Sequence, residues 1–243
     1  MMPCHRLRCD TKENMDTGPF PEPVQKRLCE GLRYSPSRVL CLAPPGELGP
    51  VAALYLAAPQ AGRQVRALLA GDPYLHTPLP AGLSLIQGDP GRAERPGGPY
   101  DLVVAWASEA FIPEPRQWLA QVIRSLRPGG RLQLDLPCAG FCPVLEACHP
   151  DAASWTLPQA AELQGWLQEL RLRELELSTW IELRIYQELG DLLEDWTRPF
   201  PLHFEGQGGQ QRLAQLRQNL ASAFEGASEL SLALRRAHIR AMR

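Results

Sequence analysis

Short apolar runs alternate with helical segments between Arg38 and Pro137, and this alternation constrains the fold more than any other feature of the chain. Runs of this length, bounded by glycine, proline and aspartate, are typical of buried strands. Strands that alternate with helices form βαβ units with right-handed crossovers. The sequence therefore predicts an α/β protein with a mostly parallel sheet. The predicted strands are Arg38–Ala43, Gln64–Ala70, Leu83–Gln87, Tyr100–Ala105 and Arg131–Leu136.

Helical periodicity is clearest over Glu114–Leu126, where Trp118, Leu119, Val122 and Ile123 share one face. Leu213, Leu216, Leu220 and Phe224 form a similar stripe. Helices are predicted over Pro23–Leu32, Leu48–Ala58, Glu114–Leu126, Leu157–Leu170, Tyr186–Trp196 and Gln211–Phe224.

The C-terminal part of the chain is less regular in its pattern. Cys138–Thr156 and Phe200–Gln210 are expected to be irregular. Arg173–Ile185 alternates enough for a strand, or for a strand that turns into a helix. Glu229–Met242 alternates at its start and is expected to be a last strand.

The domain organisation follows from these patterns. Residues 1–21 are polar and contain several prolines and glycines, which predicts a flexible N-terminal arm, and Met15 is an alternative start to Met1. Residues 22–243 are expected to form a single domain. Within it, residues 137–210 are candidates for a lid or for an insertion on the substrate side.

Charge and hydropathy argue against some classes of partner. The formal net charge is -2 and the pI is about 6.2, so no overall positive field attracts nucleic acid or an anionic membrane. No apolar run approaches the roughly 18 residues of a membrane span, and the N-terminus lacks a hydrophobic signal core. We therefore expect a cytoplasmic protein. The locally basic segment Leu234–Arg240 could contact a phosphate or a carrier protein, but the solvated face of an edge strand is the favoured interpretation.

The 7 cysteines are an odd number, which favours reduced thiols over a disulfide framework. Cys4, His5 and Cys9 form one group, and Cys138, Cys142 and Cys148 with His149 form another. Neither has the short Cys-x2-Cys pairs that zinc sites usually use. No metal site is predicted.

Residues that follow the predicted strands form the candidate ligand site, because open parallel sheets bind ligands at the carboxyl ends of their strands. Asp72 and Asp89 follow the second and third strands, and the segment from Trp106 to Glu109 follows the fourth. Two carboxylates at this edge could accept hydrogen bonds from ribose hydroxyls and an adenine amine. Each Gly-Asp-Pro is also a common turn sequence, and for either aspartate alone a turn is the simpler explanation.

The segment Tyr100–Ala105, the helix after it and Leu126–Leu132 resemble the block around the fourth and fifth strands of class I S-adenosylmethionine-dependent methyltransferases. Ser84–Asp89 is similar to the third-strand motif of that family, and Val39–Ala43 occupies the place of its first motif. The layout outside the core is similar to that of malonyl-carrier-protein methyltransferases. The resemblance implies a three-layer Rossmann-like fold, mostly parallel with an antiparallel last strand.

The resemblance also implies S-adenosylmethionine as cofactor and a set of cofactor-binding residues. These residues are Ala43, Gly46, Gly49, Asp72, Asp89 and Trp106. The first motif is degenerate, because Cys41 stands where an acid is typical and Pro44 and Pro45 enter a loop that is usually rich in glycine. A proline lacks the backbone donor that such a loop offers.

The resemblance implies a methyltransferase that acts on a small-molecule or carrier-bound acceptor. Trp106, Glu109, His149, Tyr186 and His203 are the candidates on the acceptor side, with no catalytic base assigned. The degenerate loop keeps an alternative open, a catalytically inactive methyltransferase-like protein that serves as a binding or scaffold protein. A third hypothesis is that the protein binds a different nucleotide, because a fold does not fix a function.

Overall fold

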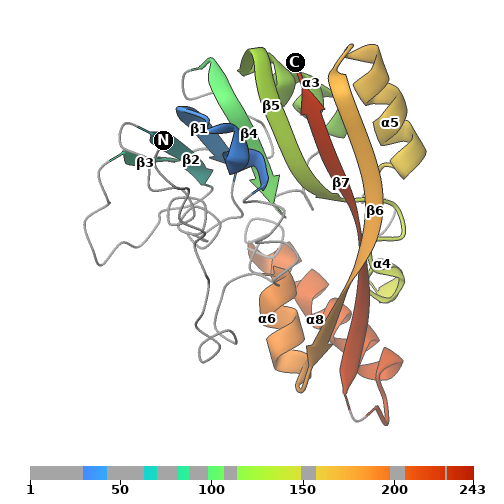
Figure 1. The fold of residues 1–243 in the computed structure, drawn as a ribbon. Helices are drawn as coiled ribbons and strands as arrows, with labels where there is room; N and C mark the ends of the chain where they lie inside the picture. Colours follow the sequence, from blue (N-terminus) through green and yellow to red (C-terminus); the bar gives the residue numbers. More distant parts are fainter. Residues whose placement is uncertain are drawn as a thin grey trace, which may run out of the picture.

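The computed structural model describes residues 30–42, 63–69, 82–87, 98–106, 114–148, 157–197, 206–227 and 229–243. The strands form a 7-stranded sheet in the order β3-β2-β1-β4-β5-β7-β6 (Figure 1). The strand bounds are Arg38–Leu42 (β1), Gln64–Leu69 (β2), Leu83–Gln87 (β3), Tyr100–Trp106 (β4), Leu126–Pro137 (β5), Arg173–Tyr186 (β6) and Leu230–Met242 (β7).

The strand directions confirm the predicted fold class. β1 to β5 pair in parallel, whereas β7 lies antiparallel between β5 and β6. Arg173–Ile185 is strand throughout, so the alternative of a strand that turns into a helix is wrong. The reason is the long ladder with β7, in which Tyr186 still pairs with Leu230.

Within the described ranges the helices agree with the predictions in place and differ in some limits. The predicted helix Leu48–Ala58 and most of Pro23–Leu32 lie outside the described residues. Cys138–Thr156 was expected to be irregular but contains α4, whose Leu145 and Cys148 are buried. α8 begins at Gly206, inside the predicted loop Phe200–Gln210. None of the helices in the described ranges is both long and apolar enough to cross a membrane. The helices are η2 (3-10, Gly31–Tyr34), α3 (Pro115–Arg124), α4 (Pro143–Cys148), α5 (Ala160–Glu169), α6 (Leu189–Thr197) and α8 (Gly206–Ala223).

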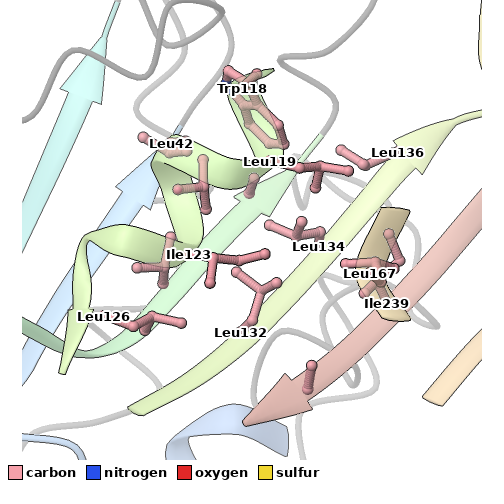
Figure 2. Packing of buried hydrophobic residues seen from close by; sticks show 14 of the residues in the cluster. Leu42, Trp118, Leu119, Ile123, Leu126, Leu132, Leu134, Leu136, Leu167 and Ile239 are labelled. Atoms are coloured by element: carbon pink, nitrogen blue, oxygen red, sulfur yellow. The ribbon is translucent and has the colours of Figure 1, made fainter. Parts of the chain in front are cut away.

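The main core lies between the sheet and the helices α3 and α5 (Figure 2). The apolar face of α3, predicted from its periodicity, contributes Trp118 and Leu119, both buried. Alternate leucines of β5, among them Leu132 and Leu134, contact this cluster. The opposite face of β5 carries Gln133 and Asp135, because successive side chains of a strand point to opposite faces.

A second core lies under the part of β6 and β7 that continues beyond the other strands (Figure 1). Leu230, Leu232 and Leu234 of β7 pack there with buried leucines of α4, α6 and α8. On β6, Leu183 and its neighbours Ile181 and Ile185 are exposed. The extension therefore has one buried face and one solvent-exposed face.

The motif residues around β4 and β5 are structural. The Asp101 carboxylate accepts hydrogen bonds from the backbone N–H groups of Ser37 (2.7 Å) and Arg38 (2.8 Å), and it pairs with Arg127 at 2.7 Å. The Pro-Gly-Gly segment is an outward bulge within β5, where Gly129 has a φ of 75°. A Cβ on Gly130 would lie 2.9 Å from two backbone oxygens, so only glycine fits there.

The Cys41 thiol is fully buried in the middle of the sheet. Burial raises its pKa to about 12, so the thiol is neutral at physiological pH. The position that the resemblance compares with an acid is therefore uncharged here.

Truncation of a buried side chain in the second core should destabilise the protein far more than truncation on the exposed face. Leu232 is 2% exposed and Leu183 is 64% exposed. Leu232→Ala should lower the free energy of unfolding by about 2–5 kcal/mol through lost burial and a cavity. Leu183→Ala is the matched control and should change it by less than about 0.5 kcal/mol. Urea denaturation followed by circular dichroism measures both, and equal losses would contradict the assignment of the two faces.

Cys41 should resist alkylation in the folded protein. At pH 8, a pKa near 12 leaves a thiolate fraction on the order of one in ten thousand, and the thiolate is the reactive form. Peptide mapping after iodoacetamide treatment should find Cys41 unmodified in native protein and modified in guanidinium chloride. Similar modification rates in both conditions would show that the thiol is not enclosed by the sheet.

Candidate functional site

The carboxyl ends of β1 to β4 lie at one edge of the sheet. Leu42 of β1 pairs with Leu68 of β2 and with Ala105 of β4, and Leu69 pairs with Gln87 of β3. This register fixes where the chain leaves each strand. Ala43, Gly46, Gly49, Asp72 and Asp89 come after these strand ends in the sequence and lie outside the described residues, so their cofactor-binding role stays a prediction.

The acceptor-side candidates are described only in part. Trp106 is the last residue of β4, and only its backbone is described. Glu109, His149 and His203 lie outside the described residues. Tyr186 ends β6 and packs against the second core, so the structure does not place it among the residues that pair with the end of β4.

A row of paired residues runs across the sheet from the end of β4. Trp106 pairs with Asp135 of β5, Asp135 pairs with His238 of β7, and His238 pairs with Ser178 of β6. Residues that pair directly place their side chains on the same face of a sheet, so Asp135, His238 and Ser178 lie side by side. This face is opposite the one that packs on α3 and α5. Asp135, His238 and Ser178 were not among the predicted site residues.

Asp135 and His238 form a hydrogen-bonded pair inside this row. His238 Nδ1 lies 3.2 Å from Asp135 Oδ2, and Trp180 Nε1 donates to Asp135 Oδ1 at 3.0 Å. Asp135 and His238 are both buried. In the neutral ring, a carboxylate that contacts Nδ1 favours the tautomer with the proton on Nδ1, and Nε2 is then an acceptor. Trp180 fixes the second oxygen of the carboxylate, so the carboxylate and the ring are both held in place.

Nε2 of His238 is buried and has no hydrogen-bond partner within the described part of the chain. A buried polar atom without a partner costs about 1–3 kcal/mol, so such atoms are rare in folded proteins and often occur at functional sites. His238 is among the residues that line a cavity of about 780 Å³. Residue Glu30 and residues of α5, β6 and β7 line the rest, among them Glu176, Ser178 and Arg240.

A buried ion pair lies beside this row on the same two strands. Arg236 of β7 pairs with Glu182 of β6 at 3.0 Å, and Glu182 also contacts Arg184 at 2.7 Å. The Arg236 guanidinium lies 5.2 Å from the centre of the Phe141 ring. Leu234–Arg240 was expected to be the solvated face of an edge strand, and this is wrong. β7 is an inner strand, so Arg236 and His238 are buried between its two neighbours.

The cysteines after β5 lie in apolar surroundings. Cys138, Cys142 and Cys148 are buried free thiols, and burial raises the pKa of each. Across the described ranges, no group of three or more histidine, cysteine or acidic side chains could hold a metal ion. Cys4, His5, Cys9 and His149 lie outside those ranges.

No family model matches the sequence, and no curated protein matches it either. Solved structures are similar over most of their length. A candidate methyltransferase from Bacillus halodurans has a TM-score of 0.54 at 16% identity, with 88% of this chain and 97% of that chain covered. The YcgJ protein from Bacillus subtilis has a TM-score of 0.56 at 16% identity, with 90% and 98% covered.

A third similar structure is an S-adenosylmethionine-dependent methyltransferase from Geobacter sulfurreducens in complex with S-adenosylhomocysteine. Its TM-score is 0.50 at 15% identity, with 93% of this chain and 92% of that chain covered. At this level of identity the comparison establishes the fold. The chain has the Rossmann-like fold of S-adenosylmethionine-dependent methyltransferases.

Proposed function

We propose that this protein binds S-adenosylmethionine and transfers its methyl group to a small-molecule or carrier-bound acceptor. The observation that carries the proposal is the likeness, over nearly the whole length of both chains, to a methyltransferase that holds S-adenosylhomocysteine. The antiparallel β7 between β5 and β6 belongs to this shared architecture. Because a fold alone does not fix a function, the proposal depends on the carboxyl edge of the sheet.

The proposed position of the cofactor site is based on the strand ends. β1, β2, β3 and β4 end at one level, and the predicted residues follow these ends. Asp72 and Asp89 would accept hydrogen bonds from the ribose hydroxyls and the adenine amine. Ala43, Gly46 and Gly49 would bring the backbone close to the ligand, and Trp106 would border it from β4.

When bound, S-adenosylmethionine supplies a methyl group on a positively charged sulfur, which needs little acid–base assistance to react. Alignment of the acceptor with that methyl group and exclusion of water provide most of the rate acceleration in such a reaction. The side chains beyond β4 would therefore act mainly by binding and orienting the acceptor.

A second function has one observation in its favour. The buried, neutral Cys41 replaces an acid, and Pro44 and Pro45 follow it. A chain that lost its hydrogen bonds to the cofactor would keep the fold and could serve as a binding or scaffold protein. Each lost hydrogen bond to a charged group weakens binding by about tenfold to 150-fold. The number of hydrogen bonds lost would therefore determine whether the protein still binds the cofactor.

Calorimetric titration separates these functions. The wild-type protein should bind S-adenosylmethionine and S-adenosylhomocysteine with micromolar affinity, because β1 to β4 end at one edge of the sheet, where open parallel sheets bind ligands. Asp89→Ala should weaken this binding by about tenfold or more, since it removes a charge-assisted hydrogen bond.

The matched control for this experiment is Asp191→Ala. Asp191 is exposed on α6, so its removal should leave the affinity unchanged. The proposal fails if the wild-type protein does not bind up to millimolar ligand. Wild-type binding that Asp89→Ala leaves intact would instead contradict the proposed position of the site.

A further inference from the structure

The outer edge of β6 is suited to pairing with the same strand of a second copy of this chain. We infer that two copies associate through antiparallel pairing of their β6 strands, with the two-fold axis at Trp180. The two 7-stranded sheets then form one continuous sheet. This inference goes beyond the proposed function and is independent of it.

β6 ends the sheet as a long edge strand. It has 14 residues, and among the described strands only β7 pairs with it (Figure 1). β3, the edge strand on the other side, has 5 residues. Short strands, prolines and bulges usually protect a sheet edge against further pairing. β6 contains no proline, and its one shift of register lies at its start, between Arg173 and Glu176. The rest of the strand therefore offers a long, regular edge.

The cavity of about 780 Å³ reaches the outer edge of β6. Three successive residues of the strand line it, Glu176, Leu177 and Ser178. Because successive side chains of a strand point to opposite faces, a cavity that contacts all three extends round the edge of the strand. Gln164 and Gln168, which lie one turn apart on α5, line it as well. An opening between a strand edge and a helix is a common place for an added strand to bind.

The second half of β6 carries an exposed apolar stripe, formed by Ile181, Leu183 and Ile185. These side chains are 61%, 64% and 52% exposed, and they are three of the four large apolar side chains that are exposed in the described part of the chain. Leu177 lies on the same face of β6, where it packs against the main core beside α5. The same face is therefore covered in the first half of the strand and exposed in the second.

The two halves of β6 complement each other when the strand pairs with a second copy. With Trp180 on the axis, Leu177 of each copy lies opposite Leu183 of the other. Antiparallel pairing places the two α5 helices at opposite ends of the paired strands, so the apolar stripe of each copy extends the core beside α5 of the other. On the opposite face, Glu176 of each copy lies opposite Arg184 of the other, and such cross-strand pairs of opposite charge are stabilising.

Charge distinguishes this register from its neighbours. With the axis at Thr179, Glu176 would lie opposite Glu182, and like charges directly opposite each other are destabilising. With the axis at Ile181, Glu176 would lie opposite Tyr186, and the pair of opposite charges would be lost. A two-fold axis between two residues would bring the apolar face of one strand beside the polar face of the other. The register with Trp180 on the axis therefore matches both faces of the strand.

Sedimentation velocity of the full chain tests the association. At about 100 µM, well above the micromolar dissociation constants of modest interfaces, the wild type should sediment with twice the 27.0 kDa of one chain. Leu183→Glu should raise the dissociation constant by about 100-fold or more, because the two-fold dimer buries the new carboxylate twice, each time opposite Leu177. Leu183 is exposed in the separate chain, so the variant should fold like the wild type below the concentration of association.

The matched control is Gln218→Glu. It adds the same charge at an exposed position of α8, so it should leave the dissociation constant unchanged.

Disulfide trapping tests the register. Opposite residues of paired strands lie within the distance that a disulfide spans. A mixture of Leu177→Cys and Leu183→Cys chains should therefore form a covalent dimer on oxidation. Either variant alone should not, because its two cysteines would lie roughly 20 Å apart along the strands. Oxidised wild type is the control for the native thiols. If Leu177→Cys does not fold, a mixture of Glu176→Cys and Arg184→Cys tests the same register on the other face.

The outcomes decide the inference. A dimer that Leu183→Glu weakens, together with a covalent dimer in the mixture only, would support it. A wild-type chain that stays monomeric at the highest concentration would overturn it. A dimer that Leu183→Glu and Gln218→Glu leave equally intact would place the interface on another surface. A dimer whose mixture forms no disulfide would contradict the pairing of the two β6 strands in this register.

Discussion

The pairing of β7 with both β5 and β6 determines most of the structure that surrounds the candidate site. β7 lies antiparallel between the two strands, and its register brings His238 beside Asp135 on one side and Ser178 on the other. The same strand continues beyond the sheet and buries Leu230, Leu232 and Leu234 against α4, α6 and α8. A shift of one residue would turn each side chain of β7 to the opposite face and would dissolve both the Asp135–His238 pair and the second core.

Local patterns in the sequence predicted the fold well. Buried strands such as Arg38–Leu42 and the amphipathic helix Pro115–Arg124 carry periodicities that belong to one secondary structure, and the structure contains both. The sequence pattern was a poor guide where tertiary contacts determine the secondary structure. α4 is too short for a clear periodicity and is stabilised by burial of Leu145, and β6 remains a strand to Tyr186 because β7 pairs with it along its length.

The site was less predictable, since its residues come from different strands. In β5, the alternation of Gln133 and Asp135 with leucines indicates a polar face, but sequence alone does not reveal that β7 lies next to this strand. The local charge of the last strand suggested an exposed edge, whereas its position between two strands buries Arg236 and His238. The residues predicted from the strand ends, such as Asp72 and Asp89, depend on loop geometry outside the described residues.

The central claim is that the carboxyl edge of the sheet binds a methyl donor. Hydrogen–deuterium exchange with and without S-adenosylhomocysteine tests it most directly, because bound ligand slows the opening of the backbone around it. We expect slower exchange in the peptides that follow β1, β2, β3 and β4, and unchanged exchange in α8. Exchange that is the same with and without the ligand along the whole chain would contradict it.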